Sequence, residues 1–261
     1  MFSELGGTSP QYPDLAGNVA LVTGGSRGIG AATCRALAAN GAKVAVNGRD
    51  QAVIDSVVAE IAADGGTAVA APGDVTDEAA VRNVRDTVEH AWVPVEILAA
   101  FAGGQGTPGP TTQLGLDQWR AVLESDLTSV YLTVTQFLPA MIERGGGAII
   151  TMSSTAGRQP GGANAAYAAA KAGVVMFTKH LAHEVGRHGI RVNCLAPSAV
   201  LNDRMRRFMS AEQLDELAAA FPLGRIGQPD DVAQAVLYLA SSASSWVTGV
   251  TLDLTGGRVI V

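Results

Sequence analysis

A tyrosine and a lysine, Tyr167 and Lys171, stand four residues apart in the stretch "YAAAK". At that spacing two side chains lie one above the other on the same face of a helix. A phenol whose pKa is near ~10 is a poor acid or base at neutral pH, but a neighbouring ammonium stabilises its phenolate form. The pair is therefore suited to general acid–base catalysis. Taken alone, however, the same pattern is more often an ordinary helix surface.

A pair of serines, Ser153 and Ser154, ends the apolar run "GAIITM", which we predict to be a β-strand. Ligands of parallel sheets bind at the carboxyl ends of the strands. A serine hydroxyl there could donate to the carbonyl oxygen of a substrate while Tyr167 gives or takes a proton. The alternative is that the two serines simply terminate a strand.

The octapeptide "TGGSRGIG", residues 23–30, joins the apolar run "NVALV" to a helix-like stretch. Gly24 and Gly28 allow a tight turn, and Gly28 and Gly30 let the backbone approach a phosphate. The N-terminus of the following helix offers free N–H groups and a partial positive charge to an anion. We predict that this loop binds the pyrophosphate of a dinucleotide, although its glycine spacing differs from the usual G-x-G-x-x-G. The alternative is a strand-to-helix turn without a ligand.

The residues after the next predicted strand bear on which dinucleotide binds. A carboxylate about 20 residues beyond the glycine loop would hold the adenosine ribose. Asp50 has that spacing, but it lies past the strand end and fits better as the N-cap of a helix. The strand end carries Asn47 and Arg49, and Arg27 lies in the glycine loop. Two guanidinium groups favour a ribose 2′-phosphate, so we expect NADP(H) in preference to NAD(H). The alternative for each arginine is a solvated surface charge.

Short apolar runs alternate with longer amphipathic ones along the chain. The predicted strands span 18–23, 43–47, 67–72, 95–101, 147–153, 190–195 and 249–254. The predicted helices lie near 29–40, 51–64, 77–90, 117–143, 163–187 and 229–241, with starts at Asp50, Thr76 and Pro229. This alternation implies one α/β domain, a doubly wound parallel sheet of about seven strands with helices on both faces.

Two segments lie outside that alternation. Residues 1–14 are expected to form a flexible N-terminal arm ahead of the domain at 15–261. Residues 198–228 carry three arginines and a helix that ends near Phe221. An insertion at this position lies near the carboxyl ends of the strands, so we predict a substrate lid near 198–221.

The composition excludes several classes of protein. Of the 261 residues, 48% are hydrophobic and 16% are charged, and the net charge is −6. These values fit a large core and argue against disorder and against a nucleic-acid-binding surface. No apolar run approaches the ~18 residues of a membrane span, and the N-terminus lacks the basic and apolar blocks of a signal peptide. The two cysteines, Cys34 and Cys194, are no disulfide framework, so we expect a cytoplasmic protein.

Three histidines and a glutamate gather near the end of one predicted helix, at His180, His183, Glu184 and His188. Their spacing could suit a metal ion. We favour a solvated helix face, because basic residues share the segment, and we expect no metal. The three tryptophans are scattered and are interpreted as structural.

Together these stretches resemble those of the short-chain dehydrogenases/reductases, especially the 3-oxoacyl-carrier-protein reductase-like group. The likeness covers nearly the whole chain from about residue 15. Besides the glycine loop and "YAAAK", the matching stretches are "GDVTD" (73–77), "SST" (153–155), "IRVNCLAPS" (190–198), "PLGRIGQPDDVAQAVLYLAS" (222–241) and "VTGVTLDLTGG" (247–257). Their order and spacing together are highly specific.

The resemblance implies a Rossmann-like fold and hydride transfer between a nicotinamide and a carbonyl or alcohol. It implies that Tyr167 is the acid–base group and that Ser154, 13 residues earlier, orients the carbonyl. Lys171 would bind the nicotinamide ribose and lower the pKa of the tyrosine. Asp74 would contact the adenine. The full set of expected cofactor-binding residues is Gly24, Ser26, Arg27, Gly28, Ile29, Gly30, Asn47, Arg49, Asp74, Val75, Ala102, Gly103, Tyr167, Lys171, Pro197, Ser198 and Val200.

Two departures from the family pattern concern loops. The usual "NNAG" reads "AFAG", so two amide side chains that would support the backbone are replaced at Ala100 and Phe101, whereas Gly103 is kept. We expect passage for the cofactor to survive there while the polar support is lost. Where the family favours glycine and threonine, "PSAVLN" has Ser198 and Asn202. Asn202 could still cap a lid helix or reach the carboxamide.

The third departure lies in "ESDLTSVYLTVTQ" (124–136), where Asp126 replaces the family's catalytic asparagine. That asparagine helps to hold a water in a proton relay behind the lysine. We retain Asp126 as a candidate catalytic residue, because its main-chain carbonyl is unchanged and its charge could pair with Lys171. An ionised carboxylate close to Tyr167 would oppose phenolate formation.

We therefore expect an NADP(H)-dependent oxidoreductase that acts on a ketone or secondary alcohol of 3-oxoacyl or other bulky type. The pocket would be formed by 104–113, 155–163 and the lid, with Gln105, Gln159 and Asn164 near polar substrate groups. The alternatives are a non-redox nucleotide-binding subunit, and an epimerase or dehydratase that uses the same tyrosine. Small residues on the helix of the tyrosine indicate a subunit interface, in a homotetramer or else a dimer.

Overall fold

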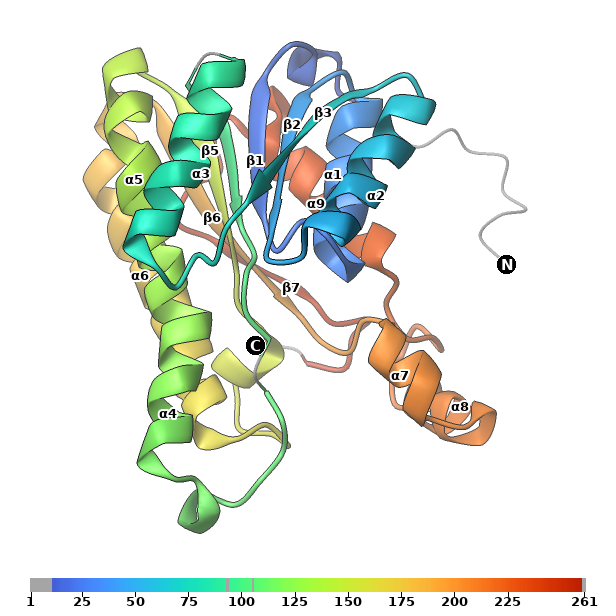
Figure 1. Cartoon of the computed structure of the whole chain (residues 1–261). Coiled ribbons are helices and arrows are strands. Elements are labelled where there is room, and N and C mark those ends of the chain that lie inside the picture. Colours follow the sequence, from blue (N-terminus) through green and yellow to red (C-terminus); the bar gives the residue numbers. More distant parts are fainter. Residues whose placement is uncertain (1–10, 93, 105, 260–261) are drawn as a thin grey trace.

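Seven parallel strands form one sheet at the centre of the protein (Figure 1). The structure is a computed structural model and describes residues 11–92, 94–104 and 106–259. The strand order is β3-β2-β1-β4-β5-β6-β7. The strands are β1 (Val19–Thr23), β2 (Lys43–Gly48), β3 (Thr67–Pro72), β4 (Ile97–Ala100), β5 (Gly147–Met152), β6 (Ile190–Pro197) and β7 (Thr251–Leu254). The predicted doubly wound sheet is confirmed, with some strand ends shifted by one or two residues.

Helices cover both faces of the sheet. One face packs against α1, α2 and α9, and the other against α3, α5 and α6 (Figure 1). The α-helices are α1 (Gly28–Ala39), α2 (Gln51–Ala63), α3 (Glu78–Ala91), α4 (Leu116–Leu123), α5 (Ser129–Arg144), α6 (Ala165–Val185), α7 (Asp203–Phe208), α8 (Ala211–Ala219) and α9 (Pro229–Ala240). Short 3₁₀ turns span Pro13–Leu15, Thr111–Gln113, Thr155–Gly157, Gly186–His188 and Ser242–Ser244. Within the described ranges, no helix combines the length and the apolar character needed to cross a bilayer.

The alternation of side chains along β1 builds the core on both faces of the sheet. Ala20 and Val22 point into the layer of α1, α2 and α9, whereas Val19 and Leu21 point into the opposite layer. All four side chains are fully buried. A strand that is covered on both faces needs apolar side chains in both directions, which explains the uninterrupted run "VALV".

Helix starts follow the capping chemistry of the sequence. The Asp50 carboxylate accepts an N–H of the first turn of α2, as predicted. α9 begins at Pro229, also as predicted. The predicted start at Thr76 is wrong, because Asp77 caps α3 and accepts two N–H groups of its first turn. The Thr76 hydroxyl instead donates to Asp74 over 2.8 Å.

The helix predicted at 117–143 is interrupted in its middle. α4 and α5 are joined by a π-helical turn, Glu124–Thr128, which contains one residue more than an α-helical turn. Asp126 lies in this turn and is completely buried. π-turns of this kind are frequent at functional sites, and this one carries a buried carboxylate.

The predicted N-terminal arm, 1–14, is described only in its last part, because residues 1–10 lie outside the described residues. The N–H of Tyr12 donates to Asn40 over 2.8 Å, and the carboxylate of Asp14 accepts from the N–H of Ser242 over 2.6 Å. These bonds tie residues 11–14 to the end of α1 and to the segment after α9.

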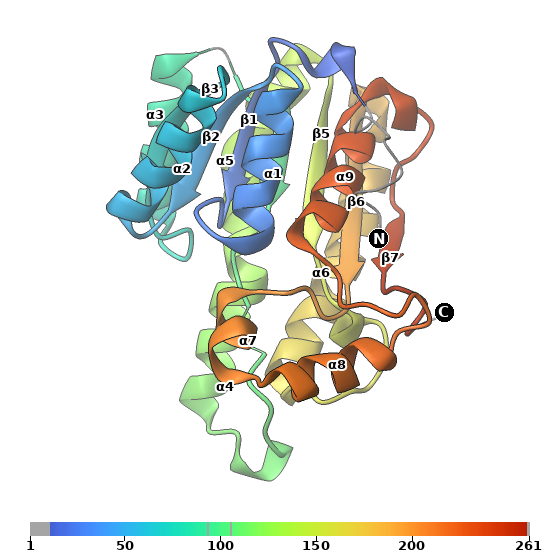
Figure 2. The ribbon, with the colours of Figure 1, turned by 90° about the vertical axis from the view of Figure 1, so that its right-hand side faces the viewer.

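The carboxyl ends of the central strands meet at one edge of the sheet. The strand order reverses between β1 and β4, so the segments that follow these two strands lead to opposite faces and leave a crevice between them. In Figure 2, α7 and α8 lie beyond this edge, apart from the helices that flank the sheet. The loops after β1, β4, β5 and β6 therefore converge beneath the predicted lid.

Candidate active site

The loop after β1 has a backbone that requires glycine. Gly24 and Gly28 have φ angles of +65° and +51°, in the left-handed region. A Cβ atom on Gly30 would overlap the carbonyl group of Gly24, so α1 can begin against the loop only without a side chain there. Space beside Gly28, in the first turn of α1, is open. This cradle at a helix N-terminus fits a phosphate group.

Three adjoining cavities follow the carboxyl edge of the sheet. The first, of about 530 Å³, extends from the glycine loop to the ends of β2 and β3. The second, of about 290 Å³, lies on the loop itself, and the third, of about 340 Å³, reaches α6. Gly103 borders all three. Each of the seventeen predicted cofactor residues borders at least one of these cavities.

Two arginines border the first cavity and are largely exposed. Arg27 lies 3.4 Å from the Asp50 carboxylate, and Arg49 lies 3.8 Å from the Asp74 carboxylate. Exposed ion pairs of this kind are weak, so both guanidinium groups can still bind an incoming anion. Asn47 is buried, and its amide donates to two main-chain carbonyls at the end of β3. It therefore shapes the floor of the cavity.

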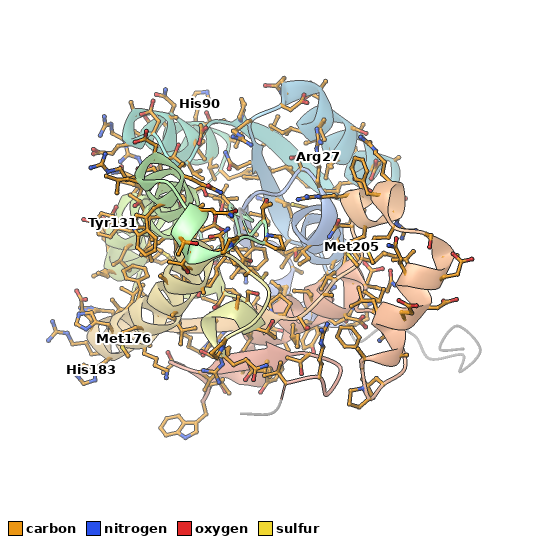
Figure 3. The ribbon with its side chains drawn as sticks, turned by 90° about the horizontal axis from the view of Figure 1, so that it is seen from below. Arg27, His90, Tyr131, Met176, His183 and Met205 are labelled. Carbon is orange, nitrogen blue, oxygen red and sulfur yellow. The ribbon has the colours of Figure 1, made fainter. Side chains whose placement is uncertain are left out.

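Ser154, Tyr167 and Lys171 come together in the third cavity (Figure 3 views this edge of the sheet). Ser154 follows β5, and the other two residues lie on α6. The Ser154 side chain interacts with the Tyr167 phenol and lowers its pKa, and the Lys171 ammonium lies 5.5 Å from the centre of the tyrosine ring. Ser153 is buried and donates to the main-chain carbonyl of Lys171 over 2.8 Å. Of the serine pair, Ser154 is therefore the one beside the phenol.

Asp126 lies behind these residues and is bound on both carboxylate oxygens. Its Oδ1 is 3.1 Å from Nζ of Lys171 and accepts the N–H of Gly104 over 2.6 Å. Its Oδ2 accepts the hydroxyl of Ser125 over 2.6 Å. Lys171 also donates to the main-chain carbonyl of Met152 over 3.1 Å. The ion pair that the sequence suggested is present and joins α6 to the π-turn. The bond from Gly104 links this pair to the loop after β4.

The Tyr167 phenol is held in its protonated form. Burial, and after it the negative charge of Asp126, raise its pKa to about 12 against an opposing interaction with Ser154. The carboxylate therefore acts against the phenolate, in the direction expected from the sequence. The positive charge of Lys171 is offset by the carboxylate with which it is paired.

The loop "AFAG" keeps polar support from a residue that the sequence analysis missed. The Thr23 hydroxyl accepts the N–H of Phe101 over 3.0 Å and that of Ala102 over 3.2 Å. The expected loss of polar support at Ala100 and Phe101 is therefore wrong for the backbone of the loop. The clue in the sequence was a hydroxyl residue at the end of β1, directly opposite the end of β4.

Of the three predicted substrate contacts, neither Gln159 nor Asn164 lines the third cavity. Gln105 lies outside the described residues. Asn164 is buried, caps α6 and donates to the carbonyl of Thr107 over 2.9 Å, so it holds a loop in place and is not exposed to a substrate. Gln159 is exposed. Asn202 caps α7, as expected, and borders the third cavity.

The histidines near the end of α6 do not line any of these three cavities. His180 and Glu184 are 3.9 Å apart, and both side chains are mostly exposed. Among the residues that the structure describes, no group of three or more histidine, cysteine or acidic side chains is spaced to hold a metal ion. Figure 3 shows His183 pointing outward at the periphery.

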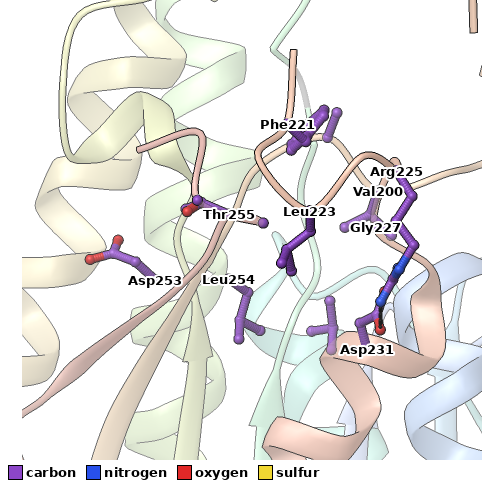
Figure 4. A pocket seen from close by; sticks show the side chains of 13 residues that line it. Val200, Phe221, Leu223, Arg225, Gly227, Asp231, Asp253, Leu254 and Thr255 are labelled. Carbon is purple, nitrogen blue, oxygen red and sulfur yellow. Dashed lines mark hydrogen bonds and ion pairs between the residues drawn. The ribbon is translucent and has the colours of Figure 1, made fainter. Parts of the chain in front are cut away.

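A fourth cavity, of about 290 Å³, lies beside the lid and away from the tyrosine (Figure 4). Phe221, Leu223 and Leu254 give it apolar walls. At its rim the guanidinium of Arg225 binds both oxygens of Asp231, over 2.6 and 2.7 Å. This ion pair joins the segment after the lid to the first turn of α9, and it engages the Asp231 carboxylate at the rim of the cavity.

Several known proteins are similar to this chain in sequence or in fold. Residues 24–258 match the family model described as enoyl-(acyl carrier protein) reductase. A 3-oxoacyl-[acyl-carrier-protein] reductase of Synechocystis sp. is 38% identical, over 94% of this chain and 98% of its own. A protein of Agrobacterium tumefaciens assigned as a gluconate dehydrogenase has a TM-score of 0.90 at 31% identity, covering 97% of this chain and 100% of its own. A gluconate 5-dehydrogenase of Burkholderia cenocepacia J2315, solved with NADP and tartrate, has a TM-score of 0.88 at 33% identity, covering 95% and 97%.

The fold and these likenesses define an oxidoreductase of the kind that binds a nicotinamide cofactor and a small-molecule substrate. More particularly, the chain belongs to the short-chain dehydrogenase/reductase family. The resemblance seen in the sequence is thereby confirmed, including the likeness to 3-oxoacyl-carrier-protein reductases.

Proposed function

We propose that the protein is an NADP(H)-dependent ketoreductase, which transfers a hydride between the nicotinamide and a ketone or secondary alcohol. The observation that supports this most is that Ser154, Tyr167 and Lys171 meet in a cavity that adjoins the glycine loop. A subunit that only bound a nucleotide would have no use for that set. A 3-oxoacyl or other bulky ketone is the proposed substrate class, supported by the likeness to a 3-oxoacyl-carrier-protein reductase.

The proposed roles follow from the contacts of each side chain. The Ser154 hydroxyl donates to the carbonyl oxygen of the ketone and orients it toward the phenol. The Tyr167 hydroxyl gives its proton to that oxygen, and the phenolate then regains a proton from water. Lys171, fixed by Asp126 and by the Met152 carbonyl, presents its stem and ammonium beside the ribose site. The bound reduced nicotinamide supplies the hydride that the carbonyl carbon receives.

The proposed activity is tested by mixing the purified protein with NADPH and a panel of ketones that includes 3-oxoacyl thioesters. Loss of NADPH absorbance with formation of one equivalent of alcohol is the expected result. Tight NADPH binding without turnover on any ketone would instead support a non-redox nucleotide-binding subunit. Change of a substrate without net oxidation of the cofactor would support an epimerase or dehydratase.

The preference for NADP(H) is supported by Arg27 and Arg49, which both border the first cavity. A charge-assisted hydrogen bond contributes about 1.5–3 kcal/mol, so each lost contact costs about 10- to 100-fold in binding. We therefore expect Arg49→Asp to lower the ratio of kcat/KM for NADPH to kcat/KM for NADH by at least about tenfold. Steady-state kinetics with both cofactors measure this ratio.

The matched control for Arg49→Asp is Arg82→Asp, which makes the same charge change on α3. Arg82 pairs with Glu78 on the helix surface and does not border the first cavity. The ratio should stay within about twofold of the parent in this variant. An unchanged ratio in both variants would show that Arg49 does not contact the 2′-phosphate.

We propose a homotetramer, because two separate apolar faces are exposed on the single chain. One comprises Tyr131 on α5 and Met176 on α6, which Figure 3 shows on the same side. The other comprises Trp246, which is 99% exposed, and Val250 beside the edge strand β7. The expectation that every tryptophan is structural in the single chain is thus wrong. Two different self-complementary faces generate a tetramer with dihedral symmetry.

We expect Met176→Glu to convert the tetramer into dimers, because a charge within one apolar face opposes its burial. Light scattering coupled to size-exclusion chromatography measures the mass. Phe208→Glu is the control, since it places the same charge on another exposed apolar side chain, in α7. Retention of four chains per particle in Met176→Glu would place the subunit contact elsewhere.

We also propose a cytoplasmic location. Cys34 and Cys194 are both buried and free, and burial raises the pKa of both thiols. Inert thiols without disulfides suit a reducing compartment. Fractionation of cells that produce the protein, followed by immunoblotting, tests the location.

A further inference from the structure

Asp126 and Lys171 form a charge pair in the interior, directly behind the proposed acid–base group. Their side chains are 0% and 3% exposed, and the two charged atoms lie 3.1 Å apart. Water does not screen charges at such a depth, so each acts strongly on its neighbours. An ammonium alone would favour a phenolate on Tyr167, whereas a carboxylate beside it works against that phenolate.

The carboxylate is held against the lysine by the surrounding backbone. The N–H of Gly104 and the hydroxyl of Ser125 donate to its two oxygens, each over 2.6 Å. A Cβ atom on Gly103 would overlap Oδ1, so the loop after β4 packs directly on the carboxylate. Besides the lysine ammonium, the side chain thus accepts a main-chain N–H on one oxygen and a hydroxyl on the other. The π-turn therefore fixes a negative charge where an amide would leave none.

We propose that Asp126 is a positioning residue that fixes the Lys171 ammonium on its own carboxylate and keeps Tyr167 protonated through the neutral range, so that oxidation of an alcohol needs alkaline solution whereas reduction of a ketone does not. This inference rests on the proposed function. In reduction the O–H bond of Tyr167 breaks as the O–H bond of the alcohol forms, while the hydride passes from NADPH to the carbonyl carbon. In oxidation the phenolate takes the alcohol proton, and the hydride passes from the carbinol carbon to NADP⁺.

Asp126 sets the pH range in which each direction of the reaction proceeds. Reduction uses the phenol and oxidation uses the phenolate, so the protonation of Tyr167 decides the range of each direction. A catalyst leaves the equilibrium constant unchanged, so the carboxylate moves the pH at which each direction levels off and not the position of equilibrium. Burial and the Asp126 charge together raise the pKa of Tyr167, which agrees with this assignment.

The other charged and titratable groups near the phenol do not supply the same effect. Lys171 on α6 has the opposite sign. Burial raises the pKa of Cys194 on β6, so its thiol is neutral. Arg27 borders the adjoining cavity and is exposed, and Glu124 in the same π-turn is exposed. The lid contributes the uncharged Asn202 and Met205 to the third cavity.

The test compares Asp126→Asn with Glu124→Gln in the full-length protein. Both variants replace a carboxylate by its amide in the same π-turn, but the first carboxylate is buried beside Lys171 and the second is exposed. The pH dependence of kcat/KM is measured for alcohol oxidation with NADP⁺ and for ketone reduction with NADPH. In the parent and in Glu124→Gln, oxidation should rise tenfold per pH unit to beyond pH ~10. In Asp126→Asn it should level off at least about one pH unit lower.

A second measurement does not depend on turnover. Ultraviolet titration of phenolate absorbance, taken as the difference between each protein and its Tyr167→Phe counterpart, follows Tyr167 alone. Its midpoint should fall by about the same amount in Asp126→Asn and stay unchanged in Glu124→Gln. Equal midpoints in all three proteins overturn the inference and leave the proposed function intact. Absence of turnover in the parent contradicts the proposed function, and the titration then still decides whether Asp126 controls the phenol.

Discussion

Tyr167→Phe is expected to reduce kcat for ketone reduction by about 10³-fold while NADPH binds as it does to the parent. The substitution removes one oxygen atom and leaves the ring that packs in the third cavity. A positioned acid contributes about 10²- to 10⁴-fold to such a reaction, and the carbonyl oxygen has no second phenol from which to take a proton. Ser154 and Lys171 remain, so residual orientation of the ketone should keep the rate above that in water.

The reason for expecting an effect on kcat and not on KM lies in where the phenol acts. Its proton moves only as the carbonyl oxygen gains negative charge, so the interaction is stronger in the transition state than in the bound ketone. Steady-state kinetics on the best ketone of the panel measure both constants, and fluorescence titration measures NADPH binding. Tyr238→Phe on α9 is the control, because α9 lies on the opposite face of the sheet from α6. A Tyr167→Phe variant that retains more than a tenth of the parent rate would rule out the proposed role.

The parts of the site that depend on residues close together in the chain could be predicted from the sequence. The spacing of Tyr167 and Lys171 places them on one helix face whatever the rest of the chain does. The glycines at 24, 28 and 30 dictate a turn against a helix N-terminus, and the structure shows why Gly30 admits no side chain. Apolar runs predicted the strands, most directly for β1, whose five residues are all buried.

Other features depend on contacts between segments far apart in the chain, and the sequence did not reveal them. Thr23 supports the "AFAG" loop only because β1 and β4 pair with Thr23 opposite Ala100. The sequence predicts Asn164 as a polar residue near the substrate pocket. In the structure its amide caps α6 and binds the loop at Thr107. Whether a polar side chain is already used in a hydrogen bond within the protein cannot be predicted until the position of its partner is known.

The π-turn could not be predicted from the sequence for a different reason. The apolar pattern of 117–143 continues through it, and the extra residue at Glu124–Thr128 changes the direction of a few side chains without breaking the helix. The sequence therefore suggested that Asp126 could pair with Lys171 but not that Ser125 and Gly104 would bind it from two further sides. The strength with which the carboxylate is held follows from these tertiary contacts.

Lys171→Met is expected to destabilise the fold as well as to abolish most activity. The change leaves the Asp126 carboxylate buried without its counter-ion, and an uncompensated buried charge costs about 3–5 kcal/mol. That is a large share of the ~5–15 kcal/mol by which a protein is usually stable. For a chain of this size we expect the melting temperature to fall by roughly 10 °C, at about 2–4 °C per kcal/mol. Differential scanning calorimetry in the absence of cofactor measures the fall.

The double variant Lys171→Met with Asp126→Asn separates charge from packing. It removes both charges and keeps the shapes of the side chains, so most of the lost melting temperature should return. The hydrogen bond from Lys171 to the Met152 carbonyl is absent in both variants and cannot account for the difference. Activity should stay low in both, because neither has an ammonium beside the phenol. Equal melting temperatures of the single and the double variant would show that the two charges do not stabilise each other. Recovery of activity in the double variant would show that Lys171 has no role in the proposed reaction.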